Sequence, residues 1–344
     1  METVSAHSGE FFMLFSNCRA VKGARRSVVV DLQREDMFFI PNDLFDLLDE
    51  LKGNSYRKVL QSYDDDSIEY LNEFIDFLKE NELGFWTDTP EYFPDLSLDW
   101  DAPSIITNAI IDVKPAFIHP WKKIFEELDE LGCKDLQLRF YDYVSPPELS
   151  GIIDLLDKKR IKSVEIILKY DSVYSKRLAL SITKKYQRIR SLFFHSSPID
   201  DVFKMSDGKT GLAMGNIVYL KQCIDSNDHC GIIASSFFSF TLGSFSEAQQ
   251  FNSCLNRKVS IDYDGNIKNC PTLKKTYGNI NTKKISEVLN ADFHEIWNIN
   301  KDQINVCRDC EFRYVCTDCR GFLDNFFDKP KKCTYDPYSA KWNN

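Results

Sequence analysis

Cysteine is concentrated near the C-terminal end of this chain of 344 residues. Seven of its eleven cysteines lie between residues 254 and 344, namely Cys254, Cys270, Cys307, Cys310, Cys316, Cys319 and Cys333. Four of them form the pattern C-x2-C-x5-C-x2-C between residues 307 and 319. Because free thiolates at such spacing oxidise or capture stray metal, the pattern predicts a bound metal centre in this region.

The rest of the composition favours a globular, cytoplasmic protein. Hydrophobic residues make up 43% of the chain and the formal net charge is −9, which argues against general binding to nucleic acid or anionic membranes. The start METVSAHSGE has no basic region followed by an apolar stretch, and no run approaches the ~20 apolar residues of a membrane span. In the cytoplasm, cysteines serve metal binding or catalysis more often than disulfides.

Residues 10–88 predict a small module of strands followed by helices. We expect FFMLFSN and RSVVVDLQREDMFFI to form short strands. Helices are expected at 42–53 and after Ser67, and the apolar residues of the second helix lie along one face. GFWTD predicts a closing strand. This order of elements is typical of a winged-helix-like module.

Residues 89–103, rich in Pro and Asp, predict a linker. From residue 104 to 250, strands and helices alternate in about four units, which indicates an α/β fold with a parallel sheet curled into part of a barrel. His119 and His195 lie where such barrels place catalytic residues, but we expect hydrogen-bonded structural roles. The isolated Cys18 and Cys133 are expected to be buried.

Residues 251–344 form the cysteine-rich region. NRKVSIDYDGNIKNC predicts a hairpin around Asp264-Gly265, a dipeptide that favours a type I′ turn. Thiolate ligands alone leave iron–sulfur and zinc open. Zinc ribbons separate their C-x2-C pairs by about 15–20 residues, whereas Cys310 and Cys316 are much closer. In two-cluster ferredoxins, cysteines this close in sequence ligate different clusters, and this precedent favours iron–sulfur clusters over zinc here.

The spacing C-x10-G-x4-C, followed by the quartet and by Cys333, resembles the seven-cysteine SPASM domain of radical S-adenosylmethionine peptide maturases. The resemblance implies two auxiliary [4Fe–4S] clusters. One would be held by Cys307, Cys310, Cys316 and Cys333. The other would be held by Cys254, Cys270 and Cys319.

The chain departs from this family at two points near the second of these clusters. Two residues separate Cys316 from Cys319, where the family usually has three. Some members also carry a further cysteine at the position of Ala248. This cluster would therefore have an open iron, or would take a remote fourth ligand from Cys230, Cys223 or His229.

The triplet C-x3-C-x2-C that binds S-adenosylmethionine in this family is not found in the sequence. YDYVSPPEL follows LQLRF, where the family has a Gly-Gly-Glu-like stretch. We therefore expect residues 104–250 to form a degenerate barrel of the radical S-adenosylmethionine type, with no S-adenosylmethionine cluster and no cleavage of that cofactor.

The stretch VKGARRSVVVDLQREDMFFIPNDLFDLL is similar to the start of the SPASM maturases of "grasp-with-spasm" systems. The resemblance implies an accessory maturase for a ribosomally synthesised peptide, acting with an ATP-grasp ligase. The precursor's leader would add as a strand to the edge RSVVVDL, beside a groove of Phe38, Phe39 and Leu44. Two alternatives stay open: an iron–sulfur enzyme that uses an open iron, and a zinc-bearing structural adaptor.

Overall fold

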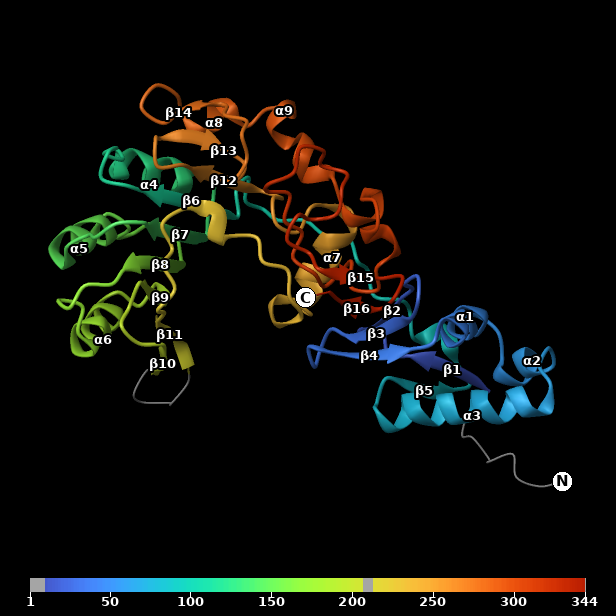
Figure 1. The fold of residues 1–344 in the computed structure, drawn as a ribbon. Helices are drawn as coiled ribbons and strands as arrows, with labels where there is room; N and C mark the ends of the chain where they lie inside the picture. The colour runs from blue at the N-terminus through green and yellow to red at the C-terminus, as the bar shows by residue number, and fades with distance from the viewer. Residues whose placement is uncertain (1–9, 207–212, 344) are drawn as a thin grey trace.

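The computed structural model describes residues 10–206 and 213–343, so the polar start METVSAHSG lies outside the described residues. Figure 1 shows an N-terminal module at one end of the molecule and a large sheet with helices at the other. The cysteine-rich region lies between them and contacts both.

The N-terminal module combines two small sheets with three helices. One sheet is antiparallel, with β3 between two neighbours: β2 (Cys18–Val21), β3 (Ser27–Asp31) and β4 (Asp36–Ile40). The other pairs β1 (Phe11–Leu14) with β5 (Gly84–Thr87). The helices are α1 (Asn42–Glu50), α2 (Tyr56–Leu60) and α3 (Asp65–Glu80).

Local sequence explains the helices of this module. The Asp64 side chain accepts a hydrogen bond from the Ser67 amide and caps α3, so the helix begins before Ser67 rather than after it. Leu71, Phe74, Ile75 and Leu78 recur at helical spacing and are buried against the sheet.

A nine-stranded sheet dominates the rest of the molecule, in the order β10-β11-β9-β8-β7-β6-β12-β13-β14. Its central strands are parallel: β6 (Asn108–Val113), β7 (Asp135–Phe140), β8 (Ser163–Lys169) and β9 (Ile189–His195). They are linked by α4 (Trp121–Glu130), α5 (Pro146–Asp154) and α6 (Lys176–Lys185). The predicted α/β class with a large parallel sheet is confirmed.

The flanking strands come from later in the chain. β11 (Ala213–Tyr219) lies parallel to β9 and pairs with β10 (Asp201–Ser206). On the other side, β12 (Lys258–Ile261) lies parallel to β6 and continues into β13 (Asn266–Lys268) and β14 (Gly278–Asn279). The cysteine-rich region therefore begins as an extension of the large sheet.

The predicted hairpin forms as β12 and β13, but the type I′ prediction is wrong. A type I′ turn needs positive φ at both central residues, and here Gly265 has φ +80° while Asp264 does not have positive φ. The Asp262 carboxylate accepts hydrogen bonds from the backbone amides of Asp264 and Asn266, which shapes a longer turn.

The remaining elements are short. The helices are α7 (Leu242–Gln250), α8 (Ile285–Val288) and α9 (Ala291–His294). Single 3₁₀ turns are η1 (Pro90–Tyr92), η2 (Asn227–His229), η3 (Ser235–Phe237), η4 (Glu295–Asn298), η5 (Lys301–Gln303) and η6 (Cys307–Asp309). A last strand pair joins β15 (Tyr335–Asp336) to β16 (Lys341–Trp342).

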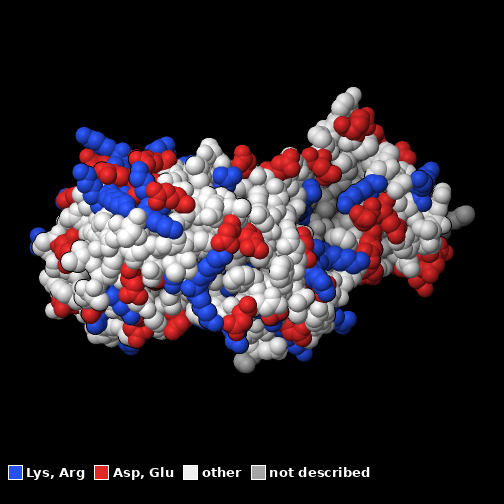
Figure 2. All heavy atoms as spheres, turned by 90° about the horizontal axis from the view of Figure 1, so that it is seen from above, with Lys and Arg blue, Asp and Glu red and all other residues white. Residues whose placement is uncertain are grey.

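Positive and negative side chains are interspersed over the face shown in Figure 2. Ion pairs on the surface of the molecule include Lys185 with Asp154 and Arg160 with Asp129. Among the described residues, every helix is too short or too polar to span a bilayer.

Candidate metal centres

The structure brings four cysteines together beside the β12–β13 hairpin: Cys230, Cys254, Cys270 and Cys319. We call them the first sulfur group. Burial, together with the nearby charges of Cys254 and Cys230, raises the pKa of Cys270 to about 11 and that of Cys319 to about 12. Such mutual effects require the four sulfurs to lie within electrostatic reach of one another.

The hairpin positions two members of this group. Cys254 precedes β12 and Cys270 follows β13, so antiparallel pairing returns the chain from one cysteine to the other. The Cys270 thiol also lies 3.2 Å from the Thr272 hydroxyl.

Cys230 reaches the group from a loop far upstream in the sequence. Lys332 Nζ donates to the Cys230 carbonyl at 2.7 Å, and Asn227 Nδ2 donates to the Pro271 carbonyl at 2.9 Å, so the loop is tied beside Cys270. Gly231 has φ +79°, and a Cβ there would lie only 2.6 Å from Cys319 Sγ. A residue without a side chain therefore allows this close approach.

The other two candidates for a remote ligand are placed differently. Cys223 is exposed to solvent. His229 forms an ion pair with Asp225 at 3.4 Å and contacts Gln222 at 3.2 Å. The structure thus brings Cys230 into the group and leaves Cys223 and His229 at the surface of the same loop.

A second sulfur group contains Cys307, Cys310, Cys316 and Cys333. Burial is the largest cause that raises the pKa of Cys307 to about 11 and that of Cys316 to about 12, and the nearby Cys333 charge contributes to both rises. Burial also raises the pKa of Cys310, with smaller contributions from Cys316 and Cys307. Cys316 and Cys319, close in sequence, therefore lie in different groups.

The chemistry of these donors suits a soft metal centre. All eleven cysteines lie in the described residues and none forms a disulfide. Eight of them form the two groups, and thiolates are the ligands of both iron–sulfur clusters and structural zinc. Within residues 10–206 and 213–343, no three His, Cys, Asp or Glu side chains are arranged so that they could hold a metal ion.

The isolated histidines and cysteines have structural roles. His119 Nε2 lies 2.9 Å from the Asp112 carbonyl oxygen, and His195 Nε2 lies 3.2 Å from the Phe140 carbonyl oxygen. Cys18 and Cys133 are buried in the two main hydrophobic cores. The expected burial of Cys18 and Cys133 and the expected hydrogen bonding of His119 and His195 are confirmed.

A buried polar network lies near the carboxyl ends of β6 and β7, and sequence reasoning missed it. Arg139 Nε donates to Asp112 at 2.6 Å, and the Tyr141 hydroxyl donates to the other carboxylate oxygen at 2.9 Å. Burial alone would lower the pKa of Arg139, but the Asp112 charge raises it, and the Cys230 charge adds to this rise. The network therefore lies within electrostatic range of Cys230 of the first sulfur group. Charged residues inside the otherwise apolar strands NAIIDV and LQLRF were the available signal.

The predicted peptide-binding edge is wrong. β3, which contains most of RSVVVDL, is the central strand of its sheet, and both of its edges are paired. Leu44 is buried in the module's core and Phe38 packs against it. Phe39 packs against Phe312 of the cysteine-rich region, with a ring-centroid distance of 5.9 Å.

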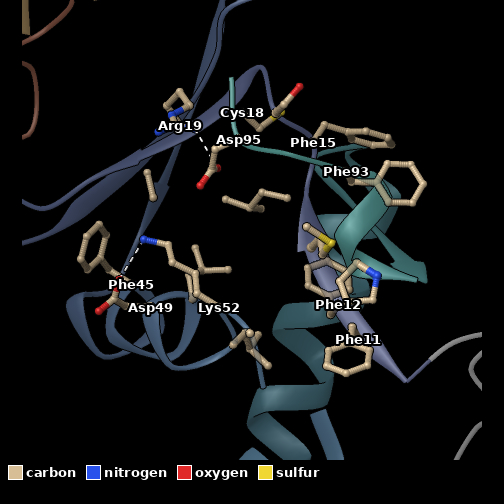
Figure 3. A pocket seen from close by; sticks show the side chains of 18 residues that line it. Phe11, Phe12, Phe15, Cys18, Arg19, Phe45, Asp49, Lys52, Phe93 and Asp95 are labelled. Atoms are coloured by element: carbon tan, nitrogen blue, oxygen red, sulfur yellow. Dashed lines mark hydrogen bonds and ion pairs between the residues drawn. The ribbon is translucent and has the colours of Figure 1, made fainter. Parts of the chain in front are cut away.

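A groove of about 290 Å³ opens elsewhere on the N-terminal module, between β1, β2 and α1. Figure 3 shows Phe15 and Phe93 on one side of it, and Phe45 of α1 with Lys52 of the turn after α1 on another. Arg19 of β2 forms an ion pair with Asp95 at the groove, at 3.3 Å. β1 pairs only with β5 and β2 only with β3 among the described strands, so each has one unpaired edge.

Comparisons with known proteins agree with the cysteine pattern. Residues 253–311 match the SPASM family, an iron–sulfur cluster-binding domain, and this segment contains Cys254, Cys270, Cys307 and Cys310. No curated protein matches the chain.

Two similar solved structures are crystal structures of Streptococcus suis SuiB. The form bound to S-adenosylmethionine has a TM-score of 0.37 and 9% identity, covering 90% of this chain and 96% of that chain. The form bound to precursor peptide SuiA has a TM-score of 0.36 and 10% identity, with the same coverage. Since these TM-scores are low, the fold of this chain is described by its own strand order.

Proposed function

We propose that this protein is an accessory maturase for a ribosomally synthesised peptide, with two [4Fe–4S] clusters in its cysteine-rich region. Residues 10–88 would bind the precursor, 89–103 would act as a linker, 104–250 would be a degenerate barrel, and 251–344 would hold the clusters. The observation that carries this proposal is the assembly of two groups of four cysteines, because Cys254 and Cys270 of the first group and Cys307 and Cys310 of the second lie in the segment that matches an iron–sulfur cluster-binding domain.

The first sulfur group would hold one cluster through Cys254, Cys270 and Cys319, with Cys230 as the fourth ligand. The second group would hold the other cluster. The clusters would supply soft, redox-capable centres that fix the surrounding chain. With four thiolates each, both clusters would be fully ligated, so this arrangement favours a structural or electron-transfer role over substrate binding at an open iron.

Metal and acid-labile sulfide analysis of anaerobically purified protein tests the clusters. We expect about eight iron and eight sulfide per chain, and about half of each in Cys310→Ala. Cys230→Ser should also lower both contents, whereas the exposed neighbour Cys223→Ser should leave them unchanged. Equal iron in the Cys230→Ser and Cys223→Ser proteins would remove Cys230 from the proposed ligand set.

The groove between β1, β2 and α1 is the proposed site for the precursor's leader. An extended peptide could pair with an unpaired strand edge while its apolar side chains contact Phe15, Phe45 and Phe93. In this way the N-terminal module would hold the precursor while an ATP-grasp ligase modifies the core peptide.

Binding of synthetic peptides encoded beside this gene, measured by fluorescence anisotropy, tests the groove. Ala20→Trp, which fills the groove from β2, should weaken binding at least tenfold. Glu69→Trp, on the exposed face of α3, is the matched control and should bind like the wild type. Co-purification of an ATP-grasp ligase from the native host tests the partner.

The alternatives give different results in these experiments. Protein that holds zinc and no sulfide would favour a structural adaptor. A cluster whose EPR signal changes on addition of the precursor would favour an iron–sulfur enzyme.

A further inference from the structure

Each sulfur group contacts a lysine that has no carboxylate partner. Lys258, at the start of β12, places its Nζ 3.4 Å from Cys254 Sγ. Lys301 is only 2% exposed, and its Nζ donates to the Cys316 carbonyl at 2.7 Å and to Ser253 Oγ at 3.4 Å. Among the ion pairs of the described residues, none includes Lys258 or Lys301.

A desolvated ammonium without a counter-charge is costly, so such lysines indicate negative charge nearby. Lys258 lies directly beside the Cys254 sulfur, with 3.4 Å between Nζ and Sγ. Lys301 reaches the second group through the Cys316 backbone, to whose carbonyl its Nζ donates at 2.7 Å.

Other cations near the two groups are already compensated. Arg320 is fully buried and pairs with Asp318 at 2.5 Å, and Arg139 pairs with Asp112 at 2.6 Å. Because each of these arginines shares its charge with a carboxylate, its net field at the sulfurs is smaller. Lys258 and Lys301 have no such paired carboxylate, and Lys258 places its Nζ beside a sulfur. Lys332 also has none, and its Nζ donates to the Asp228 and Cys230 carbonyls.

We propose that Lys258 and Lys301 are the counter-charges of the two metal–thiolate centres, and that each lysine raises the reduction potential of its own centre. This inference rests on the proposed function, because it requires clusters at both groups. One-electron reduction adds a negative charge to a cluster without forming or breaking a covalent bond. A nearby cation stabilises the reduced form more than the oxidised form, and thereby raises the potential.

An EPR-monitored redox titration with dithionite as the electron donor tests the proposal on the full chain. The signals of the two centres are assigned with the Cys270→Ala and Cys310→Ala proteins. We expect Lys258→Met to shift the reduction equilibrium of the first centre about tenfold toward the oxidised form, which is about 59 mV for one electron. Lys301→Met should shift the second centre in the same direction, and each variant should leave the other centre unchanged.

Lys274→Met is the matched control, because Lys274 lies on the exposed surface and pairs with Asp324. It should shift neither potential. Unchanged potentials in both Lys258→Met and Lys301→Met, with full iron and sulfide, would overturn the proposal while leaving the clusters established. Absence of iron and sulfide from the wild type would instead overturn the proposed function.

If a lysine-to-methionine variant loses its cluster, the arginine variant at the same position shows whether the charge or the shape of the lysine is needed. Retention of iron and sulfide in Lys258→Arg, with loss in Lys258→Met, would support the need for a cation. Loss in both variants would show that the shape of the lysine matters rather than its charge, and would overturn the proposal. Lys301 is treated in the same way.

Discussion

At the scale of single residues, Asp318 shows how two neighbouring cysteines are separated. The Asp318 carboxylate accepts a hydrogen bond from Asn252 Nδ2 at 2.9 Å and pairs with the buried Arg320. These contacts fix the chain between Cys316 and Cys319, so the two sulfurs point to different groups. The short x2 spacing, a departure from the family pattern, is therefore compatible with two centres.

His119 leads to a prediction about pH. Its Nε2–H donates to the Asp112 carbonyl oxygen, whereas Nδ1 is buried with no hydrogen-bond partner within the described residues. Burial lowers the pKa of His119 below its usual value of about 6.5. As the pH falls below about 6.5, the unfolded chain binds a proton more readily than the folded chain, so stability decreases until the folded pKa is reached.

We therefore expect urea unfolding of His119→Asn to depend less on pH than unfolding of the wild type. The free energy of unfolding would be measured at several values between about pH 7 and pH 5.5. Equal slopes for the two proteins would show that the protonation of His119 does not influence stability.

At the scale of elements, the sheet of the N-terminal module is docked onto the cysteine-rich region. Val21 and Val28 of this sheet share a hydrophobic core with Phe312, Val315 and Tyr335, and three cysteines of the second sulfur group pack against the same core. The Ala24 amide also donates to the Asp309 carbonyl at 2.7 Å. The N-terminal module, which is proposed to bind the peptide, is therefore packed against the part of the chain that surrounds the second sulfur group.

Arg26 stabilises this docking. Its Nε donates to Glu311 at 2.8 Å, and its guanidinium lies 3.6 Å from the Phe39 ring centroid. Arg26→Ala would leave the buried Glu311 with Tyr335 as its remaining partner. We expect a loss of about 1–3 kcal/mol in unfolding free energy.

The neighbouring Arg25 provides the control for that measurement. Arg25 is exposed, so Arg25→Ala should change the unfolding free energy by less than about 0.5 kcal/mol. Chemical denaturation of both variants in the metal-loaded state compares them directly. A loss of the same size in both would contradict a specific role for Arg26.

At the scale of the whole molecule, stability is unevenly distributed. The large sheet has continuous strand pairing and an extensive hydrophobic core around β6–β9. From residue 300 to 343, by contrast, the chain has only 3₁₀ turns and one pair of two-residue strands. We infer that metal binding supplies much of the folding free energy of this segment.

Removal of iron by an anaerobic chelator should therefore unfold the molecule in part. Hydrogen exchange should increase in residues 300–343 and in the docked loop at 22–26, while β6–β9 stay protected. Mass spectrometry of peptide fragments before and after chelation would measure this. Uniform protection in both states would show that metal does not hold this region together.

The sequence by itself determined the α/β class, most of the helices and strands, and the cysteine spacing on which the proposed metal centres rest. These are local properties, because apolar periodicity, turn residues and C-x2-C pairs act over a few residues along the chain. The order of strands around β3 was not accessible in this way, and neither was the turn around Gly265.

Tertiary structure decided which distant residues meet. Cys230 joins Cys270 and Cys319 because Lys332 and Asn227 tie its loop in place. Long-range contacts of this kind depend on how separate elements pack, and no local pattern encodes them. The same reason explains why Lys258 and Lys301 appear as ordinary lysines in the sequence, whereas in the fold both lie beside the sulfur groups and Lys301 is buried.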